Sequence, residues 1–248
     1  MRILSLASFL ALFLALGLPL AAHAAPAYVE VKDCRPPSEE GEFLQTCVKL
    51  NVGRRAGRVL GPGWVAPGGQ AAAVLQHRQY GATSDRVALR VHGPTGRFEG
   101  TYSMGSGGEE HAVFWSAAGR FLAWVEVDGR GGLLRVVDRQ RRRQVLSVVS
   151  PLEEWPIFAP SGSKLLLPVG RPGDDRTREL CIIDLLVKGS RQTVLQAMPD
   201  EELTQPRWIA PNTVQAVRRK VGGQKGKTVQ GSFRAPPPPP PPDEGQAE

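Results

Sequence analysis

Apolar and polar positions follow one another along most of this chain in short runs of strand length, separated by turns rich in glycine and polar residues. The run FLAWVEV at 121–127 combines aromatic and β-branched residues, and the DGRGG that follows is typical of a hairpin turn. LLRVVD at 133–138 and QVLSVVS at 144–150 again have strand length, and no helix-length segment separates them. The pattern predicts an all-β chain.

One sequence pattern occurs twice, as VFWSAAGRFLAW at 113–124 and PIFAPSGSKLLLP at 156–168. Weaker copies of this pattern are GWVAPGGQ and RWIAPNT. Each copy has an aromatic residue, a small residue, a turn and then an apolar run, and Gly119 can supply the positive φ that such a turn needs. Each period holds four strands, and Asp138 and Asp184 end the third strand of two successive periods. The small residues that mark the copies are unevenly spaced: Ala66, Ser116, Ala159 and Ala210. Constant strands and variable loops are therefore expected.

A short meander cannot bury both of its faces, whereas sheets stacked around an axis cover one another. The segments 27–31, 43–52 and 54–60 look like a period without its first strand, and 206–210, 213–220 and 227–233 supply a first strand and two more. We therefore expect a small β-propeller of four to five four-stranded blades. The N- and C-terminal strands would close it in one blade, and an open ring that needs a partner is the alternative.

The stretch 114–138 resembles the TolB-type (WD40-like, PD40) β-propeller repeat through Ser116, Gly119, Arg120 and Asp138. The next copy matches that repeat with Pro160, Gly162, Lys164 and Asp184. The aspartate of the family's turn is replaced by Ala118 and Ser161, and the outer copies at Trp64 and Trp208 are degenerate. The resemblance covers residues 60 to 220 and implies a secreted propeller that binds protein or cell-envelope partners through its rims or central channel.

Residues 1–24 read as a secretory signal peptide, with Arg2, a long apolar run and the A-x-A site Ala22-His23-Ala24. A transmembrane anchor is the alternative, because the apolar run is nearly long enough to span a bilayer. We expect a periplasmic or secreted protein without a membrane span once the signal is removed. Residues 25–234 would form the propeller domain and 235–248 a proline-rich tail. Pro236 to Pro242 predict a polyproline II rod, a disordered tail, or both.

The cysteines are Cys34, Cys47 and Cys181. An oxidising compartment favours a Cys34–Cys47 disulfide around the polar loop between them, with two free thiols as the alternative. Cys181 lies in the apolar run ELCIIDLL and is expected to be a small buried hydrophobic residue.

The net charge of +7 is clustered where turns are predicted. Solvated loop tips are the plainer interpretation, and nucleic acid is not expected as a partner because no aromatic residues interleave with the basic ones. Contact with an anionic surface is the sharper hypothesis, and it predicts binding that weakens with salt. Its candidate residues are Arg139, Arg141, Arg142, Arg143, Arg218, Arg219 and Lys220.

The sequence carries little that resembles a known catalytic motif. The G-x-S-x-G elbow and the phosphate-binding loop are absent from the sequence, and His77, His92 and His111 lack the spacing of a metal site. Adjacent carboxylates such as Glu153 and Glu154 point to opposite faces of a strand. We therefore expect a non-enzymatic binding protein without cofactor or metal, whose partner is a protein or another component of the cell envelope. A hydrolase or lyase-like enzyme with its site in the propeller channel is the alternative.

Overall fold

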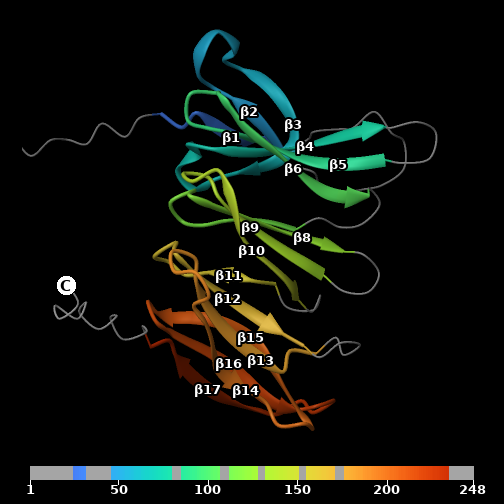
Figure 1. Ribbon diagram of the computed structural model, residues 1–248, viewed down its shortest axis with the longest axis vertical. Helices are drawn as coiled ribbons and strands as arrows, with labels where there is room; N and C mark the ends of the chain where they lie inside the picture. The colour runs from blue at the N-terminus through green and yellow to red at the C-terminus, as the bar shows by residue number, and fades with distance from the viewer. Residues whose placement is uncertain are drawn as a thin grey trace, which may run out of the picture.

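The computed structural model describes residues 25–31, 46–79, 85–106, 112–127, 132–150, 155–170 and 176–234 of the 248-residue chain. Their strands form four antiparallel sheets that follow one another along the longest axis, from the N-terminal strands at one end to the C-terminal strands at the other (Figure 1). We number them sheets 1 to 4 in chain order. Helical structure in these residues is limited to two single 3-10 turns, η1 (Gly53–Arg55) and η2 (Pro67–Gly69). The prediction of an all-β chain built from the short antiparallel meanders of a small β-propeller is confirmed.

Every sheet is a meander in which consecutive strands pair. Sheet 1 contains β1 (Tyr28–Val31), β2 (Cys47–Leu50), β3 (Arg58–Val65), β4 (Ala72–Gln79), β5 (Asp85–His92) and β6 (Phe98–Ser106). Sheet 2 contains β7 (Ala112–Trp115), β8 (Phe121–Val127), β9 (Gly132–Asp138) and β10 (Arg143–Ser150). Sheet 3 contains β11 (Ile157–Phe158), β12 (Lys164–Val169), β13 (Glu179–Asp184) and β14 (Arg191–Gln196). Sheet 4 contains β15 (Glu201–Ala210), β16 (Thr213–Lys220) and β17 (Gly226–Ser232).

The repeated sequence pattern folds into the same turn in successive sheets. The Gly119 N–H donates to the Ser116 carbonyl at 2.8 Å, and the Gly162 N–H donates to the Ala159 carbonyl at the same distance. Gly119 and Gly162 have φ values of 65° and 78°, a left-handed conformation that costs glycine little. The buried Ser116 hydroxyl adds one bond in sheet 2, because it accepts from the Phe121 N–H at 2.9 Å. The prediction of a glycine turn after the inner strand is confirmed for sheets 2 and 3, whereas the turn after β15 is Pro211-Asn212.

Apolar residues fill the spaces between neighbouring sheets. Leu89 of sheet 1 packs with Leu122 and Trp124 of sheet 2, and all three are almost fully buried. Phe114 and Phe158 lie against the cluster between sheets 2 and 3, as predicted for the aromatic residue of each copy. Each interface therefore buries sheet faces that a single meander would expose.

The N-terminal strands do not close a ring, contrary to our expectation for the two chain ends. Strands β1 and β2 continue sheet 1 through β3, whereas β15 to β17 form a sheet of their own. Tyr28 and Val48 pack on Ala72 and Val74, on the face of β4 that points away from sheet 2. The Tyr28 hydroxyl donates to the Gly93 carbonyl at 2.8 Å, and burial raises the pKa of Tyr28 to about 12, with a smaller contribution from Glu99. These strands find an apolar surface inside sheet 1, so pairing with the C-terminal sheet is not needed to bury them.

Sheet 4 ends the stack differently. Val214 and Ala216 point into the core that sheet 4 shares with sheet 3, so the alternate residues of β16 lie on the opposite face. That face is mostly polar, because β16 presents Gln215 and Arg219 there and β17 presents Thr228, Gln230 and Ser232. A polar outer face lets a terminal repeat meet water without a further sheet.

Several sequence predictions concern residues outside the described ranges. They are the signal peptide at 1–24, the thiol of Cys34 with its proposed bridge to Cys47, and the tail at 235–248. Cys181 is buried and free, as predicted. No helix within the described ranges combines the length and apolar character that crossing a bilayer requires.

Candidate functional site

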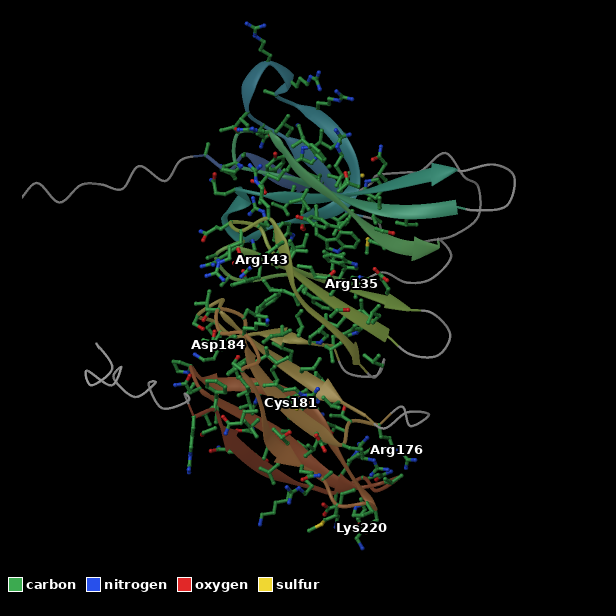
Figure 2. The ribbon with its side chains drawn as sticks, in the orientation of Figure 1. Arg135, Arg143, Arg176, Cys181, Asp184 and Lys220 are labelled. Atoms are coloured by element: carbon green, nitrogen blue, oxygen red, sulfur yellow. The ribbon has the colours of Figure 1, made fainter. Side chains whose placement is uncertain are left out.

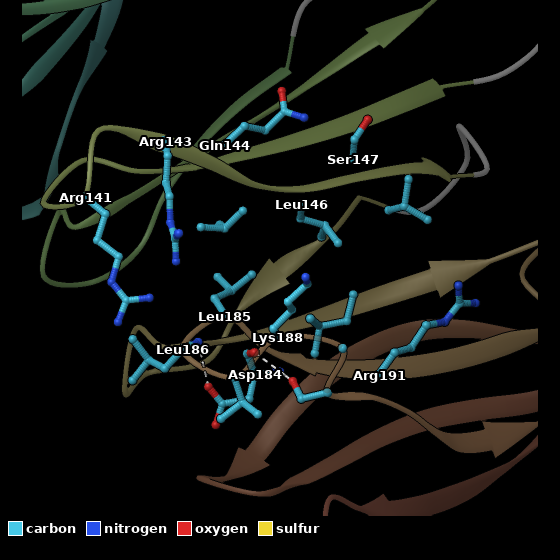
Figure 3. A pocket seen from close by; sticks show the side chains of 16 residues that line it. Arg141, Arg143, Gln144, Leu146, Ser147, Asp184, Leu185, Leu186, Lys188 and Arg191 are labelled. Atoms are coloured by element: carbon cyan, nitrogen blue, oxygen red, sulfur yellow. Dashed lines mark hydrogen bonds between the residues drawn. The ribbon is translucent and has the colours of Figure 1, made fainter.

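A groove of about 490 Å³ lies between sheets 2 and 3 (Figure 3). One wall is made by the turn after β9 and by strand β10, and the other by the end of β13, the turn that follows it and the start of β14. We call it the cationic groove, because basic side chains stand on both of its lips. Its volume is within the range of known ligand sites.

Asp138, the last residue of β9, shapes the first lip. Its carboxylate accepts hydrogen bonds from the Gln140 N–H at 3.0 Å and the Arg141 N–H at 3.3 Å, which fixes the start of the turn. The Arg120 side chain donates to both carboxylate oxygens, at 3.2 and 2.7 Å. Arg141 lies in this turn and Arg143 follows it, and both side chains extend toward the opposite wall (Figure 3).

The two partners of the ion pair between Asp138 and Arg120 differ in their exposure to solvent. Asp138 is fully buried, and the Arg120 side chain is 25% exposed. Burial by itself would raise the pKa of Asp138, but the hydrogen bonds from Arg120 and from the Arg141 and Gln140 N–H groups outweigh it and lower that pKa. The hydrogen bond between the Arg120 side chain and Asp138 raises the pKa of Arg120. Asp138 therefore stays ionised and is a structural anchor for the lip.

Asp184, the last residue of β13, shapes the second lip. Its carboxylate accepts from the Leu186 N–H at 2.9 Å. The Ser190 hydroxyl accepts from the Asp184 N–H at 2.8 Å and donates to the Asp184 carbonyl at 2.7 Å, which closes the turn (Figure 3). Leu186 and Val187, at the tip of this turn, are 42% and 45% exposed. The turn thus presents two apolar side chains to the solvent and to the groove.

The inner part of the groove is apolar because two positions that hold an ion pair elsewhere are apolar here. Between sheets 1 and 2, Arg139 donates to both carboxylate oxygens of Glu99, at 2.8 and 2.9 Å. Leu185 occupies the position of Arg139, since the Leu185 N–H donates to the Ser163 carbonyl as the Arg139 N–H donates to the Arg120 carbonyl. Val145 occupies the position of Glu99, since each is the extra residue at a bulge in the outer strand.

The same equivalence corrects one detail of the repeat alignment. Ser163, and not Lys164, occupies the position of Arg120. A serine side chain is too short to reach the aspartate at the end of the third strand, and Lys164 lies over the ring of Phe233 at 5.7 Å. Asp184 therefore has no ion pair among the described residues and uses its carboxylate within its own turn.

The charge at the rim of the groove is predominantly positive. Four basic side chains line it: Arg141, Arg143, Lys188 and Arg191. Arg141 lies 3.7 Å from the carboxylate of Asp138, which Arg120 already neutralises. Within the described part of the chain, no ion pair is formed by the other three, and Asp184 is the sole acidic residue of the lining. The groove therefore suits a ligand that combines carboxylates or other anionic groups with apolar surface.

The residues predicted for contact with an anionic surface do not form one patch. Arg141 and Arg143 line the groove, whereas Arg139 is 13% exposed and its charge is used in the bridge to Glu99. Arg142 is exposed at the turn, with a φ of 51°. The cluster on β16 belongs to sheet 4, and Figure 2 shows Lys220 far from Arg143 along the molecule. Its two arginines face acidic residues of β15: Arg218 with Glu201, and Arg219 with Glu202.

Sequence reasoning missed Lys188 and Arg191, which complete the rim. Both lie in the segment VKGSR after the third strand of their period, the place that RQRRR occupies one period earlier. The equivalence of these two turns was the available signal. Two cations in a turn look like a solvated loop until the fold places a second basic turn opposite them.

The alternative hypothesis, an enzymatic site along the inner strands, finds little support in the described residues of β7 and β11. Strand β7 reads AVFW and β11 reads IF, so neither carries an acid, a base or a nucleophile. The Trp115 indole N–H donates to the Trp64 carbonyl at 3.3 Å, and the Trp208 N–H donates to the Ile157 carbonyl at 3.0 Å. These tryptophans tie β7 to β3 and β15 to β11. Over the described ranges, no three histidine, cysteine or acidic residues gather as metal ligands would.

Comparison with known proteins gives likeness in fold alone. No family model and no curated protein matches the sequence. Among solved structures, TolB from Acinetobacter baumannii is 13% identical with a TM-score of 0.38, over 84% of this chain and 49% of that chain. Prolyl oligopeptidase B from Galerina marginata is 13% identical with a TM-score of 0.49, over 84% of this chain and 32% of that one. The chain thus spans about half and a third of these two proteins, and at such scores we base no functional conclusion on them.

Proposed function

We propose that this protein is a non-enzymatic β-propeller of the periplasm or extracellular space that binds a protein or cell-envelope partner through the cationic groove. The observation that carries the proposal is the combination of exposed Leu186 and Val187 with three basic rim side chains that form no ion pair among the described residues. These three are Arg143, Lys188 and Arg191. Apolar surface supplies affinity, and unpaired rim charges steer an anionic partner and select its orientation. The residues at 1–24 support the compartment, because they read as a signal peptide.

A photocrosslinking experiment tests the use of the groove. Benzoylphenylalanine replaces Val187, which is 45% exposed at the groove, or Val59, which is 50% exposed on β3 and serves as the matched control. Irradiation in an envelope extract should give a discrete adduct with the probe at Val187 and none of the same size with the probe at Val59. The adduct should weaken in high salt and in the R143E/K188E variant, because rim charges attract the partner.

Adducts of equal yield at both positions would contradict the proposal, since the groove would then have no special role. An adduct at Val187 that neither salt nor the double charge reversal affects would show that the basic rim does not take part in binding.

A further inference from the structure

Strand β10 forms one wall of the cationic groove and is the edge strand of sheet 2. The strand order of this sheet is β10-β9-β8-β7, so β10 pairs on one side only. Among the described residues, no backbone hydrogen bond joins its other side to any neighbour. An edge strand of this kind presents a row of N–H and C=O groups that can accept a further strand.

The edge at β10 differs from two other outer edges, those of β14 and β6, in how it meets the neighbouring sheet. In sheet 3, β14 is approached closely by β17, because a Cβ atom built on Gly231 would lie 2.2 Å from the Val194 carbonyl oxygen. In sheet 1, Glu99 of β6 is tied to the next sheet by Arg139. Among the described residues, β10 has neither a strand of another sheet against its edge nor an ion pair to the next sheet. Its Val145, Leu146 and Val148 pack against the core between sheets 2 and 3, and the groove runs beside the strand.

The sequence of β10 is also unusual for an exposed edge. Proteins commonly protect edges with charged residues, and β10 has only Arg143, at its first position. Val145, Leu146, Val148 and Val149 follow, and Val149 is 69% exposed. An edge strand rich in valine and leucine is suited to pairing with an incoming strand.

We propose that the cationic groove takes an extended, acidic segment of a partner protein, which pairs with β10 as a fifth strand of sheet 2. This inference rests on the proposed function and specifies the part of the partner that binds. Main-chain hydrogen bonds to β10 supply affinity, and the alternating side chains supply selectivity. Apolar side chains of the segment contact Leu186 and Val187, and its carboxylates meet Arg143, Lys188 and Arg191.

The dimensions of the site agree with such a segment. Six residues of β10, from Arg143 to Val148, line the groove. At about 3.3 Å per residue, they offer roughly 20 Å of edge, enough for a peptide of about the same number of residues. A small anionic amphiphile such as palmitate would use the apolar wall and the rim as well, but it would leave the backbone of β10 unpaired.

A display selection identifies the ligands without assuming their sequence. Random ten-residue peptides are selected on the full chain, and the R143E/K188E variant removes peptides that bind elsewhere. We expect enriched peptides in which Asp or Glu alternates with Val, Ile, Leu or Thr. The R54E/R55E variant is the matched control, since it reverses two exposed charges on η1 of sheet 1, and it should retain binding.

Two measurements then test strand pairing itself. Hydrogen exchange of the amides at 143–150 should slow when a selected peptide binds, because pairing protects the outer edge of β10. N-methylation of alternate peptide amides should weaken binding by about tenfold or more, because it removes donors and leaves every side chain in place. Palmitate is the comparison ligand and should not change exchange at 143–150.

Selected peptides that leave the exchange of β10 unchanged, or that tolerate N-methylation of both sets of alternate amides, would overturn the inference, because the set that faces β10 must be needed for pairing. A selection in which no peptide binds the wild-type chain better than the R143E/K188E variant would also overturn the inference, whether or not palmitate binds. In each of these cases a salt-sensitive adduct at Val187 would still support the proposed function, so the two proposals fail separately.

Discussion

Sheets 2 and 3 are two copies of one sequence pattern, and they differ in what happens after the third strand. Both copies have the glycine turn at the same geometry, and both end the third strand with an aspartate. Asp138 is fully buried in an ion pair with Arg120, whereas Asp184 is partly exposed and binds only its own turn. The comparison teaches that the repeat preserves the backbone, while the side chains after it decide whether a junction between sheets is tied by charge or left open.

The junctions on either side of sheet 2 show the same contrast. Arg139 and Glu99 bridge sheets 1 and 2, and Leu185 and Val145 occupy the equivalent positions between sheets 2 and 3. With apolar residues in place of the ion pair, the described residues form no ion pair between sheets 2 and 3, and the cationic groove lies at this junction.

The largest effect is expected from removing the buried carboxylate. D138A leaves Arg120 and two backbone N–H groups without their acceptor, which should lower the free energy of unfolding by about 3 kcal/mol. D184A removes a bond at an exposed turn and should cost less than about 1 kcal/mol. Urea unfolding of both variants measures the difference, and equal costs would show that the two aspartates have the same role.

A smaller effect is expected from pH. The pKa of Asp138 is lowered in the folded state, so its contribution to stability is fully present above the unfolded value of about 3.9 and is lost as pH falls through the lower folded value. The melting temperature of the wild type, measured from pH 6 downward, should therefore fall more steeply than that of D138N. The D184N variant should follow the wild-type profile, and parallel profiles for wild type and D138N would contradict the assignment.

The smallest effect is expected at the bridge between sheets 1 and 2. A double-mutant cycle with E99Q and R139Q should give a coupling energy of about 1 kcal/mol, because the bridge is bidentate and mostly shielded from solvent. The cycle with V145A and L185A at the equivalent positions tests apolar contact, and its coupling should not depend on salt. A bridge coupling that also ignores salt would show that packing, and not charge, joins sheets 1 and 2.

Much of the fold follows from the sequence, because glycine turns and short apolar runs act locally. The strands of sheets 2 and 3 and the turns at Gly119 and Gly162 were predicted for this reason. The place of β1 and β2 was not, because their apolar residues suit any exposed sheet face, and only the assembled structure shows that β4 offers the nearest one.

The candidate site was half predictable. Arg141 and Arg143 belong to a conspicuous basic run. The same run includes Arg139, whose side chain is paired with Glu99, forty residues earlier in the sequence. Such long-range pairing leaves no mark in the local sequence. Lys188 and Arg191 become meaningful only when two turns, one period apart, face each other across a groove.

The two ends of the stack have a consequence for how copies of this protein meet. A stack of sheets with apolar end faces would lower its free energy by binding further copies end to end, and it would grow into filaments. Here β1 and β2 cover the apolar face of β4 at one end of the stack, and the outer face of sheet 4 at the other end carries glutamine, threonine and arginine. Within the described part of the chain, the two ends of the stack therefore offer little hydrophobic driving force for end-to-end polymerisation.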